Sequence, residues 1–277
     1  MKKILYLLLF FQLFIDFALA QFFVEKEFKL EKGIVYAPRN FNPSLKPHRI
    51  FVHLHGSPKV VIENFAKLSV NGILISLHLG SLSSPYRLAF SDQTYFQATI
   101  DTALRILRDS IDNFSWHDAE KIYITSFSAG YGGVREILKN EKYYKKINTI
   151  ILADGLHTDY VSDLDSTNDC KLPNPILLQN FLRFAKDAVK GKKELIVTHS
   201  EIYPGSYSST TECANYLLEN SSTERIFAEM YYAERLIQKS YAFRNRFRTF
   251  GFYGDTGPDH MQHFFNLPLF IKMLDLN

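Results

Sequence analysis

The sequence has little net charge and no feature that divides it into parts. Its net charge is +3 at pH 7 over 277 residues, and no basic run with interleaved aromatic residues occurs. Nucleic-acid binding is therefore not indicated, because nucleic-acid-binding proteins gather positive charge on one face. No internal repeat, low-complexity tract or linker occurs either, and this length suits one α/β domain or two small ones.

Long hydrophobic runs are scarce, and the clearest one stands at the start of the chain. Two lysines precede an apolar run over residues 4–15, and Ala18-Leu19-Ala20 follows it. This order is typical of a secretory signal peptide, residues 1–20, cut after Ala20. A retained anchor is the alternative, although the run is short for a membrane span and Asp16 interrupts it. We expect a secreted or periplasmic mature chain, residues 21–277, with no lipid anchor and no later membrane span.

Cysteine is rare, with Cys170 and Cys213 as the two examples. In an oxidising compartment they could pair. The bond would close a loop of about forty residues and add roughly 3–4 kcal/mol of stability in the chain-entropy model. Two free buried thiols are the alternative. Because we expect export, we predict the disulfide.

Strand and helix patterns alternate from residue 49 to the end of the chain. After an expected antiparallel hairpin at 22–37, apolar runs indicate strands at 49–54, 73–79, 121–125, 149–153, 194–198 and 247–253. Helical spacing occurs at 60–68, 94–111, 176–189, 213–218, 223–238 and 261–274. Continuous apolar strands imply burial on both faces. We therefore predict an α/β three-layer sandwich with a mostly parallel central sheet and an N-terminal antiparallel hairpin.

One stretch, residues 121–138, has the pattern of a strand, a tight turn and a helix. The turn is Ser126-Phe127-Ser128-Ala129-Gly130. A serine at the apex of such a turn needs small residues two positions before and after it, because the strand and helix backbones nearly touch there. Ser126 and Gly130 are both small. The stretch therefore predicts a nucleophile elbow of the form S-x-S-x-G in place of G-x-S-x-G, with an ordinary strand-to-helix turn as the alternative.

The elbow, the chain order and the number of strands together resemble the serine hydrolases of the α/β-hydrolase fold, of esterase or lipase type, over about residues 22–277. The resemblance implies a catalytic triad in the chain order nucleophile, acid, histidine. Ser128 matches the nucleophile, which needs a histidine to accept its proton. His260 follows the last expected strand and matches that histidine, while His263, one helical turn further on, is the alternate.

Two residues compete for the acid of the triad. Asp154 directly follows the expected strand at 149–153, and Glu201 lies three residues beyond the strand at 194–198, which is the commoner family position. We prefer Asp154, because a buried strand fixes where its short side chain can reach. The role of the acid is to hold the histidine tautomer and to stabilise the imidazolium.

The same resemblance implies an oxyanion hole made of two backbone N–H groups. The N–H of Ala129 follows the nucleophile directly. His55-Gly56-Ser57, at the end of the strand at 49–54, is similar to the family's His-Gly element. The second donor would be the N–H of Ser57 or, as the alternate, that of Gly56.

A metal site is a rival interpretation, because several histidines fall near strand ends in the same layer as Asp154. His53-x-His55 is the nearest thing to a metal-binding pair and no H-E-x-x-H motif occurs, so we expect no metal and no cofactor. The sequence predicts an exported serine esterase that uses acyl-enzyme chemistry on an ester or acylated substrate, either a small molecule or a polysaccharide. Residues 155–192 are expected to form a cap or insertion. A secreted, non-catalytic binding protein on the same fold is the alternative function.

Overall fold

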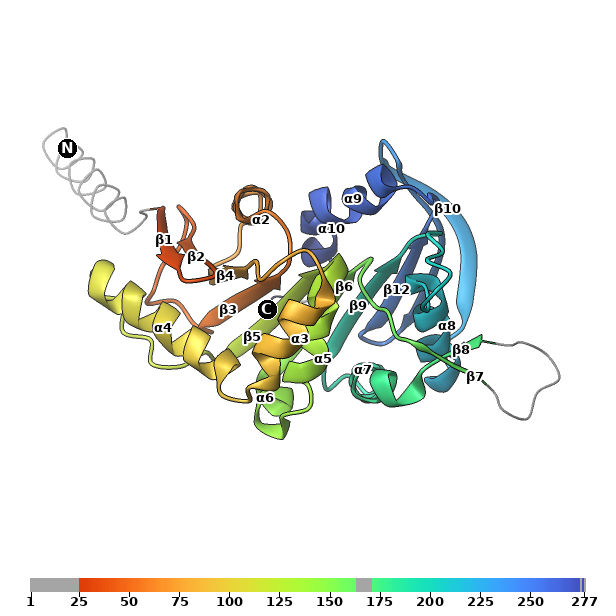
Figure 1. Cartoon of the computed structure of the whole chain (residues 1–277). Coiled ribbons are helices and arrows are strands. Elements are labelled where there is room, and N and C mark those ends of the chain that lie inside the picture. Colours follow the sequence, from red (N-terminus) through yellow and green to blue (C-terminus); the bar gives the residue numbers. More distant parts are fainter. Residues whose placement is uncertain (1–24, 163–170, 275, 277) are drawn as a thin grey trace, which may run out of the picture.

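The computed structural model describes residues 25–162, 171–274 and 276. The expected signal peptide and Cys170 lie outside these residues. Within them, one large sheet is covered by helices on both faces (Figure 1). No helix in this part of the chain is long and apolar enough to cross a membrane.

The strands are β1 Lys26–Leu30, β2 Gly33–Ala37, β3 Arg49–Leu54, β4 Ile73–Leu77, β5 Lys121–Phe127, β6 Ile147–Ala153, β7 Tyr160–Ser162, β8 Lys171–Pro173, β9 Glu194–His199, β10 Arg225–Ala233, β11 Leu236–Arg244 and β12 Phe247–Phe252. The helices are α2 Pro58–Ala66, α3 Ser83–Ser91, α4 Tyr95–Ser110, α5 Tyr131–Ile137, α6 Glu141–Lys146, α7 Pro175–Val189, α8 Thr210–Asn220, α9 Gly257–Phe265 and α10 Leu267–Lys272. A short 3-10 helix, η1 Ser128–Gly130, joins β5 to α5.

The ten-stranded sheet has the order β1-β2-β4-β3-β5-β6-β9-β12-β11-β10. Its central strands, from β4 to β12, pair in parallel. The β1–β2 hairpin at one edge and the β10–β11 hairpin at the other edge pair antiparallel. The predicted fold class is therefore confirmed: the protein has an α/β fold with a mostly parallel central sheet and an N-terminal antiparallel hairpin.

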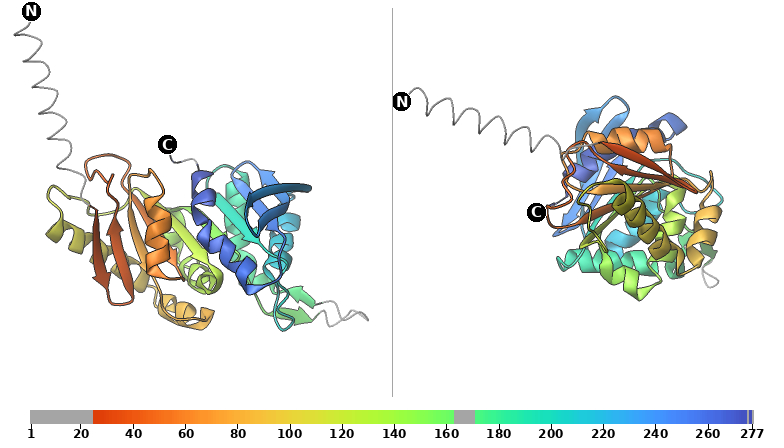
Figure 2. Two further views of the ribbon diagram at one scale, coloured as in Figure 1. Left: turned by 90° about the horizontal axis from the view of Figure 1, so that it is seen from above. Right: turned by 90° about the vertical axis from the view of Figure 1, so that its left-hand side faces the viewer.

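The central strands bury both faces because their apolar residues alternate between two cores. Ile150 and Leu152 of β6 belong to the core under α3–α8, whereas Ile151 and Ala153 belong to the core under α2, α9 and α10. Figures 1 and 2 show these two helical layers on opposite sides of the sheet. The same alternation runs through β3, β5 and β9, so every central strand holds both layers in place.

The helix predicted over 223–238 is wrong, because this segment forms β10 and the start of β11. Strand β11 alternates buried and half-exposed residues along most of its length, as expected where β10 and β12 flank it. The turn between β10 and β11 carries Arg235 at φ 60°, a backbone conformation that glycine usually takes. No glycine or proline lies in that turn, so no local sequence signal indicates that the segment folds back on itself.

The structure also corrects the predicted disulfide, because Cys213 is a free, buried cysteine. It lies on α8 among the core residues of that layer, and its Sγ is 3.1 Å from the Oγ of Ser208. Burial raises the pKa of the thiol to about 11. Its surroundings are those of a packed, protonated side chain, which is the alternative that the sequence left open.

The segment predicted as a cap, residues 155–192, contains two different kinds of structure. Its second half includes α7, whose apolar face packs on the sheet. Its first half leaves the edge of the sheet after β6 and contains β7 and β8, which form a separate two-stranded sheet. Figure 1 shows this small hairpin projecting beside α8. Whether these residues act as a cap stays a prediction.

Candidate active site

The turn between β5 and α5 holds Ser128 in a strained backbone conformation. Its φ is 44°, a left-handed value that residues with a side chain seldom adopt. Close packing on both sides explains how the strain is sustained. A Cβ on Gly130 would lie 2.3 Å from the carbonyl oxygen of Leu54, and one on Gly133 would lie 2.7 Å from the ring of Phe90. The small residues of the turn therefore let the serine-bearing bend press against β3 and α3, as an elbow requires.

Gly155 makes the closest approach to this bend from the neighbouring strand. A Cβ on Gly155 would lie 2.5 Å from the oxygen and 2.6 Å from the nitrogen of Ser128, and both are backbone atoms that cannot swing away. Gly155, the second residue after β6, therefore sets how tightly the Ser128 backbone fits against the sheet.

Replacing Gly155 by alanine is expected to destabilise the protein by about 1–3 kcal/mol, the usual range for overpacking. Displacement of Ser128 should also lower any activity that depends on this residue. Urea unfolding measures the first effect. Gly257→Ala is the matched control, because a Cβ there meets nothing within 4 Å and it should leave stability nearly unchanged. A Gly155→Ala protein as stable as the parent would contradict the close fit.

The structure brings together Asp154 and His260, which are far apart in the sequence. The Nδ1 of His260 lies 2.7 Å from Oδ2 of Asp154. The other oxygen of that carboxylate accepts a hydrogen bond from the backbone N–H of Ser200 at 2.9 Å and one from the hydroxyl of Thr210 at 2.6 Å. The Asp154 side chain is 2% exposed, so this carboxylate is held rigidly by three donors inside the protein.

The surroundings of Asp154 decide its charge. Burial favours the neutral acid, but the nearby His263 and the hydrogen bonds from His260 and Thr210 outweigh it and hold the pKa of Asp154 well below its usual range. The group is therefore a carboxylate at neutral pH. A carboxylate facing Nδ1 keeps the proton on that nitrogen and leaves Nε2 of the imidazole as the base.

Helix α9 fixes the position of His260. Its N-terminus is a capping box in which Thr256 and Asp259 bond to each other's backbone N–H groups, and Pro258 stands in its first turn. The ring of His260 packs against the ring of Phe127, with centroids 4.5 Å apart. Since Phe127 directly precedes Ser128, this contact places the imidazole beside the turn that holds Ser128. The Ser128 hydroxyl makes no hydrogen bond to any residue that the structure describes, and such bonds often tighten only when substrate binds.

The two alternates lie elsewhere and have other partners. His263 is 1% exposed, and its Nδ1 is 2.7 Å from the hydroxyl of Thr198. Glu201 forms an ion pair with Lys239 at 2.5 Å and accepts a hydrogen bond from the N–H of Gly254. Of the two predicted acids, the structure places Asp154 against His260.

The loop predicted to supply the second oxyanion donor is also strained. His55 has φ 77° and Gly56 has φ 118°, and a Cβ on Gly56 would lie 2.4 Å from the ring of Phe264. The ring of His53, buried in β3, holds the loop through Nε2, which lies 2.6 Å from the carbonyl oxygen of His55. Ser57 follows as the N-cap of α2, so the loop ends at a helix N-terminus, where N–H groups lack helical partners.

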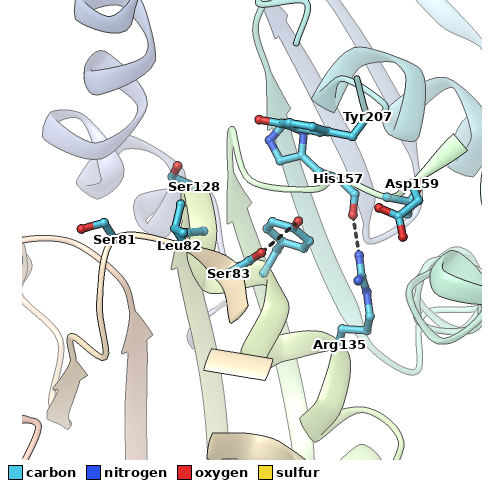
Figure 3. Close-up of a pocket in the computed structure, with 11 residues that line it drawn as sticks. Ser81, Leu82, Ser83, Ser128, Arg135, His157, Asp159 and Tyr207 are labelled. Carbon is cyan, nitrogen blue, oxygen red and sulfur yellow. Dashed lines mark hydrogen bonds between the residues drawn. The ribbon is translucent and has the colours of Figure 1, made fainter. Parts of the chain in front are cut away.

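A pocket of about 340 Å³ opens at Ser128 and Ala129. Figure 3 shows Ser128 with Ser81 and Leu82 on one side, and Arg135, His157 and Asp159 on the other. The pocket is also lined by Ser83, Tyr131, Thr158 and Tyr207. The hydroxyl of Tyr131 lies 3.4 Å from the Oγ of Ser83. Most of these residues carry polar groups, so the pocket suits a polar ligand more than a long alkyl chain.

Sequence reasoning gave no role to Arg135, His157 or Tyr207. No motif marks them, and they come from three separate parts of the chain. The one available signal was that Arg135 lies one helical turn beyond Tyr131 on the helix that starts at the elbow. Its placement near Ser128 could have been inferred from that spacing.

The strained serine that follows β5 and the Asp154–His260 pair that follows β6 and begins α9 are the features on which a functional proposal can rest. No family model matches the sequence, and no curated protein matches it. Among solved structures, the chain is similar to Est1E from Butyrivibrio proteoclasticus, with 13% sequence identity and a TM-score of 0.40. The match covers 90% of this chain and 96% of Est1E.

Two archaeal structures show similar values. The esterase Pf2001 of Pyrococcus furiosus has 12% identity, a TM-score of 0.39, and 90% and 92% of the two chains covered. The acylaminoacyl peptidase of Pyrococcus horikoshii has 15% identity and a TM-score of 0.45, and the match covers 90% of this chain and 41% of that one.

Proposed function

We propose that the protein is a serine hydrolase that cleaves a carboxylic ester through an acyl-enzyme intermediate. The observation that carries the proposal is the 2.7 Å contact between His260 and the buried carboxylate of Asp154, placed beside a strained serine at a strand-to-helix turn. This combination costs folding free energy, because it buries a charge and holds Ser128 at positive φ. A catalytic role would explain why the protein keeps this costly arrangement.

In the proposed reaction, the Oγ of Ser128 attacks the ester carbonyl while Nε2 of His260 accepts the serine proton. Asp154 holds the imidazole through Nδ1 and stabilises the imidazolium that forms. The alcohol then leaves with the proton from Nε2. Water attacks the acyl-enzyme by the same route in reverse, which restores the Ser128 hydroxyl and releases the acid.

Negative charge develops on the carbonyl oxygen during both attacks. The N–H of Ala129 is the first proposed donor to that oxygen, and the N–H of Ser57, or that of Gly56, is the second. Such donors are worth about 3–4 kcal/mol in the transition state. The bond from His53 to the carbonyl of His55 supports this assignment, because it fixes the backbone of the loop before the reaction begins.

Export is a separate proposal, and it rests only on the lysine-led apolar run and the A-x-A site of residues 1–20. The proposed substrate is an ester of a small molecule or of an acylated polysaccharide.

A fluorophosphonate probe tests the proposed function directly. We expect the probe to label the folded protein at Ser128, with one adduct per chain by intact mass, and the label to be absent from Ser128→Ala. Labelling reports the activated nucleophile without any assumption about the substrate. A folded protein that never reacts would favour a non-catalytic binding protein, and inhibition by chelators without labelling would favour a metal-dependent hydrolase.

A further inference from the structure

One side chain of the pocket has a charge that the proposed chemistry does not use. Arg135 lies on α5 and lines the same pocket as Ser128, yet it is only 8% exposed. A guanidinium stays protonated at neutral pH even though burial lowers its pKa. The pocket therefore contains a permanent positive charge that is largely removed from water.

Arg135 has no carboxylate partner in the part of the chain that the structure describes. One of its Nη2 hydrogens goes to the carbonyl oxygen of His157, and its Nε finds no hydrogen-bond partner there. Glu136, its neighbour in the sequence, pairs with Lys139 at 2.7 Å instead. The ring of Tyr131 lies 5.1 Å from the guanidinium carbon, which stabilises the cation but does not neutralise it.

Other groups that face the pocket do not supply the missing charge. Burial lowers the pKa of His157, so its imidazole is neutral at neutral pH. Asp159 is exposed at the rim, and its carboxylate and that of Glu136 favour the Arg135 cation only at long range, since neither forms an ion pair with it within the described residues. A buried, unpaired cation is costly, and a ligand anion would remove that cost and gain a charge-assisted hydrogen bond.

We propose that Arg135 selects esters whose acyl part carries a carboxylate, so that the preferred substrates are half-esters of short dicarboxylic acids. The proposal rests on the function given above, because it places the scissile carbonyl at Ser128. A single guanidinium matches a single carboxylate in charge and can bind it through two N–H groups. The acyl part stays bonded to Ser128 in the intermediate, so its carboxylate remains at Arg135 through both half-reactions.

The products that follow are an alcohol and a dicarboxylate. In the first half-reaction the Ser128 oxygen bonds to the acyl carbon and the ester C–O bond breaks. In the second, water replaces Ser128 and the new carboxylic acid loses its proton. The product then bears a second negative charge, at the carbon released from Ser128.

Matched pairs of chromogenic esters test the proposal. The probes are the mono-4-nitrophenyl esters of succinate, glutarate and adipate, each compared with its neutral methyl-capped counterpart, and Ser128→Ala supplies the background rate for spontaneous hydrolysis. For the full-length protein we expect kcat/KM to favour the charged member of at least one pair by about tenfold or more. Arg135→Met should lower that ratio about 10–100-fold, the range for hydrogen bonds to a charged group, and Arg135→Lys should fall between the two.

Controls separate charge recognition from folding. Arg183→Met is the matched control, because Arg183 also lies over a tyrosine ring, at 3.8 Å, but pairs with Glu141 on the surface and should not change the ratio. Asp159→Asn should raise the ratio, because it removes the negative charge at the rim. If Arg135→Met fails to fold, competitive inhibition of the parent protein by glutarate, compared with the neutral glutaramide, provides the second measurement.

Three outcomes have distinct meanings. A charge preference that is lost in Arg135→Met supports the proposal. Labelling of Ser128 and turnover of neutral esters without any charge preference would overturn this inference and leave the proposed function intact. Absence of both labelling and turnover would overturn the two together.

Discussion

Ser128→Ala is expected to lower kcat for ester hydrolysis by about 10⁶-fold while the protein folds as before. Loss of the serine nucleophile of a triad has an effect of this order, and the rate that remains comes from the oxyanion hole and substrate binding. Alanine removes one oxygen from a half-buried position and leaves the turn otherwise unchanged. The free energy of unfolding should therefore differ from that of the parent by no more than about 1 kcal/mol, or should exceed it. The reason is that the Ser128 side chain makes no hydrogen bond in the described part of the chain.

The measurement is pre-steady-state and steady-state hydrolysis of a 4-nitrophenyl ester in excess over enzyme, with an initial burst of nitrophenol as the sign of an acyl-enzyme. Ser126→Ala is the matched control, because Ser126 lies two residues earlier in the same turn and is fully buried. It should retain activity within a few-fold. Equal loss in both variants would mean that the turn, and not the Ser128 hydroxyl, had been damaged.

Asp154→Asn is expected to lower kcat by about 10⁴-fold, as the same change does in other triads. The amide would keep an oxygen for Ser200 and Thr210, but its NH₂ group would face Nδ1 of His260 and favour the wrong tautomer. The loss should appear in kcat more than in KM, because Asp154 does not line the pocket. Glu201→Gln tests the competing acid, and it should stay within a few-fold of the parent.

Asp154 should also make stability depend on pH in a defined direction. Its folded pKa is depressed, so its carboxylate contributes stability that is fully present above its unfolded pKa of about 3.9. That contribution is lost as the pH falls below this value toward the folded pKa. Urea unfolding at pH 7 and pH 3 measures the effect. The gap in stability between the parent and Asp154→Asn should be larger at pH 7, and a gap that grows at pH 3 would contradict the assignment.

The candidate nucleophile and its turn could be predicted from the sequence because they are local. A strand that leads into Ser126-Phe127-Ser128 and is followed by glycines has the small residues that a sharp serine turn requires, all within a few positions. The central strands were predictable for a similar reason, since each is a continuous apolar run that must be covered on both faces. The pairing of Asp154 with His260 was inferred from chain order, and the structure places the two side chains together.

The errors and omissions have physical causes of a different kind. The helix predicted in place of the β10–β11 hairpin is wrong because the turn between these strands has Arg235 at positive φ. A glycine would have indicated such a turn, and none is present there. The disulfide prediction is wrong because Cys213, on α8, is packed in the hydrophobic core as a free thiol. The spacing of cysteines in the sequence does not reveal this packing. The close contact of Gly155 with Ser128 exists only because β6 lies beside β5 in the sheet.

By itself, therefore, the sequence determined the layered α/β fold and the serine turn, since both follow from the order of apolar and small residues along short segments. Only the tertiary structure decided which carboxylate meets His260 and that Arg135 shares a pocket with Ser128. Those relations depend on how the strands are ordered in the sheet and how the helices pack on it. Distances between residues far apart in the chain are properties of that packing and not of any local pattern.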